Sequence, residues 1–154
     1  MSLSSFGKPI YEEDLKKIFD INNFKINMDY FKFHKDPSKS FSEKLCELFG
    51  EPYLDISEES NFNKYADIAC SAQMILEYTM KNLIKKATDL SGKRKIVLTG
   101  GVALNCKMIH NLSKQGIFEE LIVPPSPGDS GSAVGAANFA FLEKSKNKTL
   151  NFSR

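Results

Sequence analysis

Apolar residues recur at spacings of three and four along one stretch of the chain, from about Asn63 to Leu90. Such spacing places them on one face of an α-helix, which makes one turn in 3.6 residues. The positions are Tyr65, Ile68, Ala69, Ala72, Ile75, Leu76, Thr79, Leu83, Ala87 and Leu90. Ser91 and Gly92 follow, and glycine commonly ends a helix. The pattern therefore predicts one long helix over 63–90.

Shorter elements are predicted before this helix. Segment 11–20 has an apolar face, with acidic residues first and lysines later, as the helix dipole favours. It is predicted as a short helix. Apolar and polar residues alternate in 24–28 and again in 31–33, which predicts two short strands that can pair as a hairpin. Segment 41–49 has helical spacing before Gly50 and is predicted as a helix of about ten residues.

Two units of strand, turn and helix follow the long helix. In the first, an apolar strand from about Lys95 ends in the glycine pair 100–101, and a helix ended by Gly116 comes next. In the second, a short strand at 121–123 leads through a turn rich in proline and glycine to a last helix over 130–142. The sequence therefore predicts an α/β fold.

The two turns are expected to form one site. If the two strands are parallel neighbours, Gly100, Gly101 and Asp129 lie at the same edge of the sheet. Residues 131–137 are almost all glycine, alanine or serine. So many small side chains predict that the last helix packs closely against another backbone or a ligand.

Composition limits the possible partners and the size of the fold. With 154 residues, 42% of them hydrophobic, the chain can form one compact unit. Its net charge of +2 comes from 21 basic and 19 acidic residues without a basic stripe, so we do not expect nucleic acid as a partner. The three cysteines are widely spaced, which is typical of reduced thiols and predicts a cytoplasmic protein. No apolar run approaches the roughly 20 residues of a membrane helix.

Gly100 and Gly101 have two interpretations. The pair can be a tight turn alone, or it can be a seat for an anion or a nucleotide, because glycine lets a ligand approach the backbone closely. A dinucleotide-binding fold is excluded as the explanation. That fold requires a third glycine and an acidic residue after the next strand, whereas Pro124 and Pro125 stand there.

Asp129 and Asn105 are candidate ligand-binding residues. Asp129 can be the N-cap of the last helix, a carboxylate for a metal or phosphate site, or both. Asn105 falls one turn into its predicted helix, where it can be a surface residue or can reach a ribose or phosphate bound over the glycines. Both interpretations stay open for each residue.

The histidines and cysteines are weaker candidates. His34 and His110 lie in different elements without a partner at metal-ligand spacing, so neither is predicted to bind a metal. Cys106 begins a helix, where a thiol can become reactive, but no histidine lies nearby to activate it. We expect Cys106 to be buried as a small apolar side chain.

Several segments together resemble the O-carbamoyltransferases, the family of the nodulation-factor and antibiotic carbamoyltransferases, which is related to the tRNA threonylcarbamoyladenosine synthases. The resemblance extends from about residue 4 to 143. Its central motifs are 96–106 (IVLTGGVALNC), 116–118 (GIF) and 123–137 (VPPSPGDSGSAVGAA). Shorter segments that match the family in the same order are 5–9 (SFGKP), 30–33 (YFKF), 48–50 (LFG) and 67–73 (DIACSAQ).

The resemblance implies a lobe of the actin, sugar-kinase and heat-shock ATPase fold (ribonuclease H-like), with a mixed sheet flanked by helices. Residues 4–143 would be the second lobe of the transferase domain, and 144–154 a linker or tail. Family enzymes make carbamoyl adenylate from carbamoyl phosphate and ATP, then transfer the carbamoyl group to a hydroxyl of a small acceptor. By this resemblance Gly100, Gly101 and Asn105 contact the adenylate, and Asp129 binds a divalent metal, iron in the family.

Two family features have no counterpart in this sequence. The family's metal site also uses a His-x-x-x-His pair from the first lobe, and carbamoyl adenylate is made in a separate domain. We therefore expect the chain to be a fragment that is inactive alone and exposes apolar surface through which it self-associates. The catalytic residues and the acceptor stay unidentified. The alternatives are a non-catalytic nucleotide-binding or interaction module and a lobe of a sugar-kinase-like ATPase.

Overall fold

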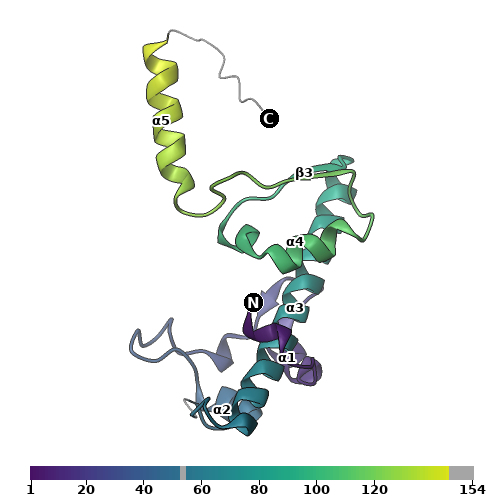
Figure 1. Cartoon of the computed structure of the whole chain (residues 1–154), viewed down its shortest axis with the longest axis vertical. Helices are drawn as coiled ribbons and strands as arrows, with labels where there is room; N and C mark the ends of the chain where they lie inside the picture. The colour runs from purple at the N-terminus through teal and green to yellow at the C-terminus, as the bar shows by residue number, and fades with distance from the viewer. Residues whose placement is uncertain (53–54, 146–154) are drawn as a thin grey trace.

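A computed structural model of the chain describes residues 1–52 and 55–145. The fold is mixed α/β, with two small sheets flanked by helices, which confirms the predicted class (Figure 1). The helices are α1 (Glu12–Ile18), α2 (Glu43–Phe49), α3 (Glu59–Ser91), α4 (Cys106–Ser113) and α5 (Gly131–Lys144), with 3-10 turns η1 (Leu3–Ser5), η2 (Met28–Tyr30) and η3 (Gly101–Leu104). The strands are β1 (Phe19–Asp20), β2 (Lys25–Ile26), β3 (Lys95–Val97) and β4 (Glu120–Ile122). Of the tail predicted over 144–154, residues 146–154 lie outside the described residues.

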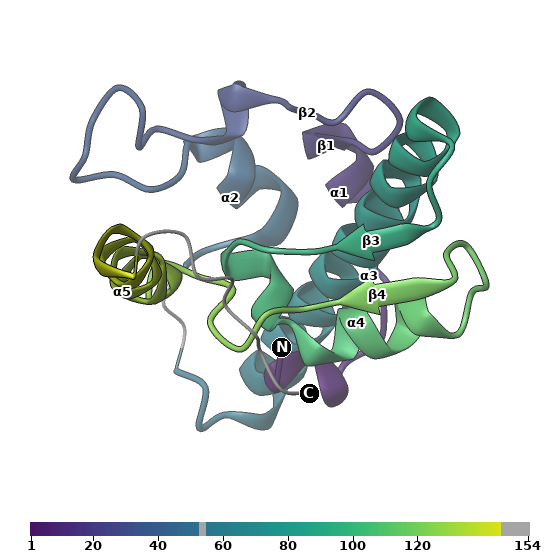
Figure 2. The same ribbon diagram turned by 90° about the horizontal axis from the view of Figure 1, so that it is seen from above.

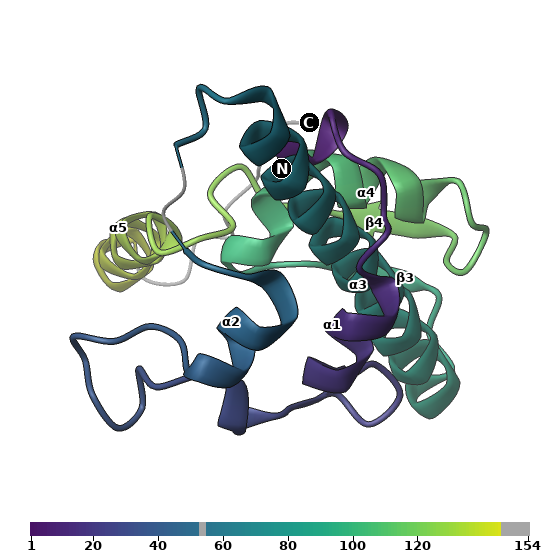
Figure 3. The same cartoon turned by 90° about the horizontal axis from the view of Figure 1, so that it is seen from below.

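Helix α3 is the longest element, and other parts of the chain pack along it (Figure 3). It contains 33 residues and begins four residues before the predicted start. Gly92 ends it as predicted: with φ of 65° it adopts the left-handed conformation, and its N–H donates to the Thr88 carbonyl at 2.9 Å. The long apolar stripe therefore predicted this helix correctly.

The N-terminal elements pack on the first part of α3. Leu15 and Ile18 of α1 form a buried cluster with Ile75 of α3, and partly buried aromatic and aliphatic side chains surround it. The hairpin predicted within 24–33 is wrong in its pairing. Only Lys25–Ile26 is a strand there, and it pairs antiparallel with Phe19–Asp20, the two residues that directly follow α1.

The N-terminal segment crosses α3 at Gly7. An added Cβ at Gly7 would overlap the backbone of Ala66 and Asp67. The N-terminal segment and α3 are therefore in backbone contact there, without room for a side chain. Two hydrogen bonds hold the crossing. The Lys8 N–H donates to the Asp67 carboxylate at 2.6 Å, and the Tyr11 N–H donates to the Ser71 hydroxyl at 3.0 Å. Gly7 is therefore required by close backbone packing.

Strands β3 and β4 pair in parallel, with Lys95 opposite Glu120 and Val97 opposite Ile122 (Figure 2). This confirms the prediction that the two strands are parallel neighbours. Ile96 and Leu98 pack on a buried cluster formed by Met80 and Ile84 of α3 and Met108 and Leu112 of α4. The opposite face is open, since Val97 is 66% exposed and Ile122 is 45% exposed.

Helix α5 stands apart from the rest of the described structure in all three views (Figures 1–3). None of its residues is buried, and an added Cβ at Gly135 would meet nothing within 4 Å. The prediction that its small residues pack closely holds at Gly131, where an added Cβ would be 2.5 Å from the Ser126 carbonyl oxygen, but not at Gly135 within the described residues. Its apolar side chains are exposed instead, including Phe139 at 68%. Among the described residues, none of the helices is both long and apolar enough to span a membrane.

Candidate functional site

The two turns that follow β3 and β4 are joined directly to each other. The Gly100 N–H donates to the Pro127 carbonyl at 2.6 Å, and the Thr99 hydroxyl donates to the same oxygen at 3.1 Å. Gly128 lies against Gly101, because a Cβ added at Gly128 would be 3.9 Å from the Gly101 Cα. This confirms that both turns meet at the same edge of the sheet.

The backbone of the glycine turn, residues 100–101, is exposed to solvent. Gly100 has φ of 94°, a conformation that side-chain-bearing residues rarely adopt, and it is exposed together with Gly101. A Cβ added at either glycine would meet nothing within 4 Å. Within the described residues, the N–H groups of Gly101 and Val102 donate to no protein acceptor. Two adjacent free donors above open space can bind an anion.

The residues that follow the glycine pair do not form the predicted helix at once. Instead the chain makes the short 3-10 turn η3, and α4 starts after Asn105. Gly116 is not the residue directly after the helix, because α4 ends at Ser113, although Gly116 does have a positive φ of 64°.

Asn105 is the N-cap of α4 and does not lie one turn into the helix, as the sequence predicted. Its Oδ1 accepts from the Met108 N–H at 3.0 Å. Its Nδ2 donates to Gln73 Oε1 at 2.8 Å, and Gln73 Nε2 donates back to Asn105 Oδ1 at 3.2 Å. The asparagine amide therefore connects the end of the glycine turn to α3.

Asp129 lies exposed in the second turn, one residue after Gly128. No described residue bonds its carboxylate, and its backbone carbonyl accepts from the N–H and the hydroxyl of Ser132 at 3.1 and 2.7 Å. The N-cap of α5 is Ser130, without a side-chain cap bond, so the interpretation of Asp129 as the capping residue is wrong. The carboxylate is thus free to bind a cation.

The described residues do not form a complete metal site. Among 1–52 and 55–145, no three histidine, cysteine, aspartate or glutamate side chains gather where they could hold an ion. His34 and His110 are both exposed, at separate places in the fold. Asp129 would therefore be one ligand among others supplied from outside these residues.

Cys106 is exposed, so the prediction of a buried apolar role is wrong. It is the first residue of α4, and the buried face of that helix is formed by Met108 and Leu112. A position two residues before Met108 falls on a different face of the helix.

Sequence reasoning overlooked two residues beside the glycine turn. Gln73 is 7% exposed and Glu77 is half-buried, both on α3. A signal was available, because Gln73 lies in the apolar stripe, four residues after Ala69 and three before Leu76. A polar side chain on a buried face requires hydrogen-bond partners, and here they come from the candidate site.

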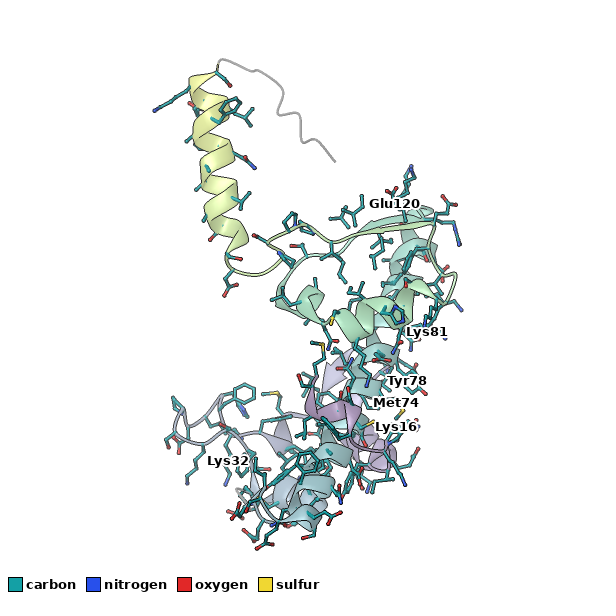
Figure 4. The ribbon with its side chains drawn as sticks, in the orientation of Figure 1. Lys16, Lys32, Met74, Tyr78, Lys81 and Glu120 are labelled. Atoms are coloured by element: carbon teal, nitrogen blue, oxygen red, sulfur yellow. The ribbon has the colours of Figure 1, made fainter. Side chains whose placement is uncertain are left out.

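A separate hollow of about 510 Å³ lies between α1 and α3. Lys16, Tyr78 and Lys81 are among its lining residues and are labelled in Figure 4. Hydrogen bonds to Glu12 and Glu13 raise the pKa of the Lys16 ammonium, so these charges are already paired within α1. The hollow includes no residue of either glycine-containing turn and is distinct from the candidate site.

Comparisons with known proteins agree on one family. A family model described as Carbamoyltransferase N-terminus matches residues 1–138. An uncharacterized protein of Synechocystis, sll1178, is 32% identical over 141 residues, which cover 89% of this chain and 23% of that protein. Nodulation protein U of Sinorhizobium fredii is 31% identical over 110 residues, or 70% of this chain and 19% of the relative. Nodulation protein NolNO of the same organism is 34% identical over 74 residues, or 48% and 11%. The chain spans less than a quarter of the length of each of these relatives.

Proposed function

The chain belongs to the O-carbamoyltransferase family, and from this premise we propose that it is the nucleotide-binding second lobe of such an enzyme, with an actin-like fold. The intact enzyme moves a carbamoyl group from carbamoyl adenylate, made from carbamoyl phosphate and ATP, to a hydroxyl of a small acceptor. The acceptor hydroxyl loses its proton as its oxygen bonds to the carbamoyl carbon, the bond from that carbon to the adenylate phosphate oxygen breaks with its electron pair going to that oxygen, and AMP and the proton leave. The observation that carries the proposal is the pair of free N–H groups on the open glycine turn.

Each candidate residue has a role in this proposal. The N–H groups of Gly101 and Val102 donate to the adenylate, while Gly100 keeps the approach open with its positive φ. Asn105 contributes an amide hydrogen from the end of the same turn. These groups hold the nucleotide in place and stabilise negative charge on its phosphate as AMP departs.

Asp129 is proposed as one anionic ligand of a divalent metal, with iron as the family's metal. Its carboxylate is exposed in the turn that touches the glycines, and no residue that the structure describes pairs with it. A bound cation there would offset phosphate charge. The other ligands are proposed to come from the first lobe of the enzyme.

The open face of the β3–β4 sheet is proposed to contact the rest of the enzyme. Parallel sheets are normally covered on both faces, whereas Val97 and Ile122 are exposed here, as are apolar residues of α5. The first lobe is the proposed partner, and covering this face would close the site against water. Without that partner, the same surface is expected to drive self-association.

Gly101→Ala tests the nucleotide site. We expect ATP to bind the intact variant at least about tenfold more weakly, because a methyl group would occupy the space where the ligand touches the backbone. The melting temperature should not change, since a Cβ at Gly101 meets nothing within 4 Å and φ is not in the left-handed region. Photolabelling with 8-azido-ATP, followed by quantifying tryptic peptide 96–107, measures binding at this turn separately from ATP sites elsewhere in the protein.

Gly92→Ala is the control, because it also adds a methyl group in open space, at the far end of α3, and its positive φ makes it the more destabilising of the two changes, by about 1 kcal/mol. It should label peptide 96–107 like wild type. Equal labelling of the Gly101 variant and wild type would exclude the turn as the nucleotide seat. Labelling without any carbamoyl transfer by the intact wild-type protein would instead favour a nucleotide-binding module.

A further inference from the structure

A network of four polar side chains connects α3 to both ends of α4. Glu77 Oε1 accepts from Gln73 Nε2 at 2.8 Å, and Glu77 Oε2 accepts from Asn111 Nδ2 at 2.8 Å. Gln73 in turn exchanges two hydrogen bonds with Asn105. Gln73 is buried and the other three are half-buried, so these bonds are made largely away from water.

The orientation of both central amides follows from chemistry at the two ends of the network. At one end, the Glu77 carboxylate accepts hydrogen bonds, so Gln73 directs its NH₂ group toward Glu77. At the other end, the Met108 N–H only donates, so Asn105 must direct its oxygen toward the helix start. Between these ends, Gln73 Oε1 faces Asn105 Nδ2, as a donor and acceptor pair requires.

This arrangement determines what Asn105 can offer a ligand. Its oxygen accepts from both Met108 and Gln73, and one of its two amide hydrogens goes to Gln73. Within the described residues, the second amide hydrogen has no acceptor. The Asn105 side chain is therefore held with one N–H available to donate and with its oxygen already accepting hydrogen bonds. A free N–H donor suits the oxygens of an anionic ligand.

We propose that Gln73 is a positioning residue for the nucleotide site: supported by Glu77, it fixes the Asn105 amide in the donating orientation and anchors the end of the glycine turn to α3. The inference rests on the proposed function, since it assigns the donor to the adenylate. Gln73 itself is bonded to Asn105 and Glu77 and acts only through Asn105.

A double-mutant cycle in the intact protein tests this role. We expect Gln73→Met to weaken ATP binding about fivefold, because the Asn105 amide would spend most of its time in other orientations and only the competent fraction binds. In an Asn105→Ala background, the same change should have less than about a twofold effect, since no amide is left to orient. The readout is the ATP concentration that half-protects peptide 96–107 from 8-azido-ATP labelling.

The outcomes separate this inference from the proposed function. Equal effects of Gln73→Met in both backgrounds would mean a general structural role and overturn the inference. An Asn105→Ala protein that binds ATP like wild type would overturn the proposed role of Asn105, and the inference with it. If Gln73→Met does not fold, Gln73→Asn replaces it, because asparagine stays polar but is shorter by one methylene group. Its effect on ATP binding should likewise disappear in the Asn105→Ala background.

Thr79→Val is the matched control on the same helix. Among the described residues, the Thr79 hydroxyl bonds only the Ile75 carbonyl of its own helix, at 2.8 Å, so its loss should leave ATP protection unchanged. A shift equal to that of Gln73→Met would show that any altered polar group on α3 changes binding and would overturn the specific role of Gln73.

Discussion

Asp129→Asn in the intact protein is expected to lower carbamoyl transfer about 100-fold or more and to remove most of the bound metal. Asparagine keeps the size of the side chain but replaces an anionic ligand with a neutral amide that binds divalent ions poorly. In the metal-free protein, the free energy of unfolding should change by less than about 0.5 kcal/mol, because the exposed carboxylate has no hydrogen bond in the described structure. Metal content by mass spectrometry, transfer to the best hydroxyl acceptor and a melting curve measure these effects.

Asp89→Asn is the matched control, since Asp89 is also exposed but lies near the end of α3. It should keep both metal and transfer. A variant at Asp129 that retains wild-type metal and rate would show that this carboxylate is no ligand. An early melting transition of the metal-free variant, compared with metal-free wild type, would show a structural role that the hydrogen bonds do not account for.

Gly7→Ala is expected to destabilise the fold by about 3 kcal/mol. The added methyl group would overlap the backbone of Ala66 and Asp67, and neither can move aside like a flexible side chain. Relief would require separating the N-terminal segment from α3, which strains the bonds from Lys8 and Tyr11. Urea unfolding of the intact protein, followed by hydrogen exchange of the α3 amides, measures the loss.

Gly135→Ala provides the comparison for that change. Gly135 lies inside α5 with open space around its Cα, so alanine should be tolerated or slightly stabilising, by up to about 1 kcal/mol. If Gly7→Ala unfolded at the same urea concentration as wild type, the crossing at Ala66 would not be as tight as the structure shows.

The sequence predicted those elements whose residues carry a long or repeated local pattern. Ten positions of helix α3, nine of them apolar and the other Thr79, keep the spacing of a helix, and β3 and β4 each precede a turn marked by glycine or proline. The prediction of the hairpin failed because the strands are two residues long. Alternation of apolar and polar residues over so short a segment does not indicate which strand pairs with which. The prediction of close packing for α5 holds only at its first residue, Gly131, which lies against the Ser126 backbone, because small residues indicate a close neighbour without identifying it.

The candidate site was predictable as a meeting of two turns, because parallel strands place their carboxyl ends together. Its details depend on contacts distant in sequence. Asn105 was expected inside a helix, and only the 3-10 turn before it makes it a cap. Its bond to Gln73 joins residues 32 positions apart, and no local pattern specifies such a pairing.

Neighbouring residues of α3 belong to different hydrophobic clusters. Ile75 is buried with α1, whereas Leu76 packs with Met80, Ile84 and α4. Successive side chains on a helix point about 100° apart, so a single turn of α3 serves both clusters. Melting this turn would release both clusters at once, so we expect the elements that pack on α3 to unfold together. Helix α5 belongs to neither cluster, and its unfolding is not coupled to theirs through these contacts.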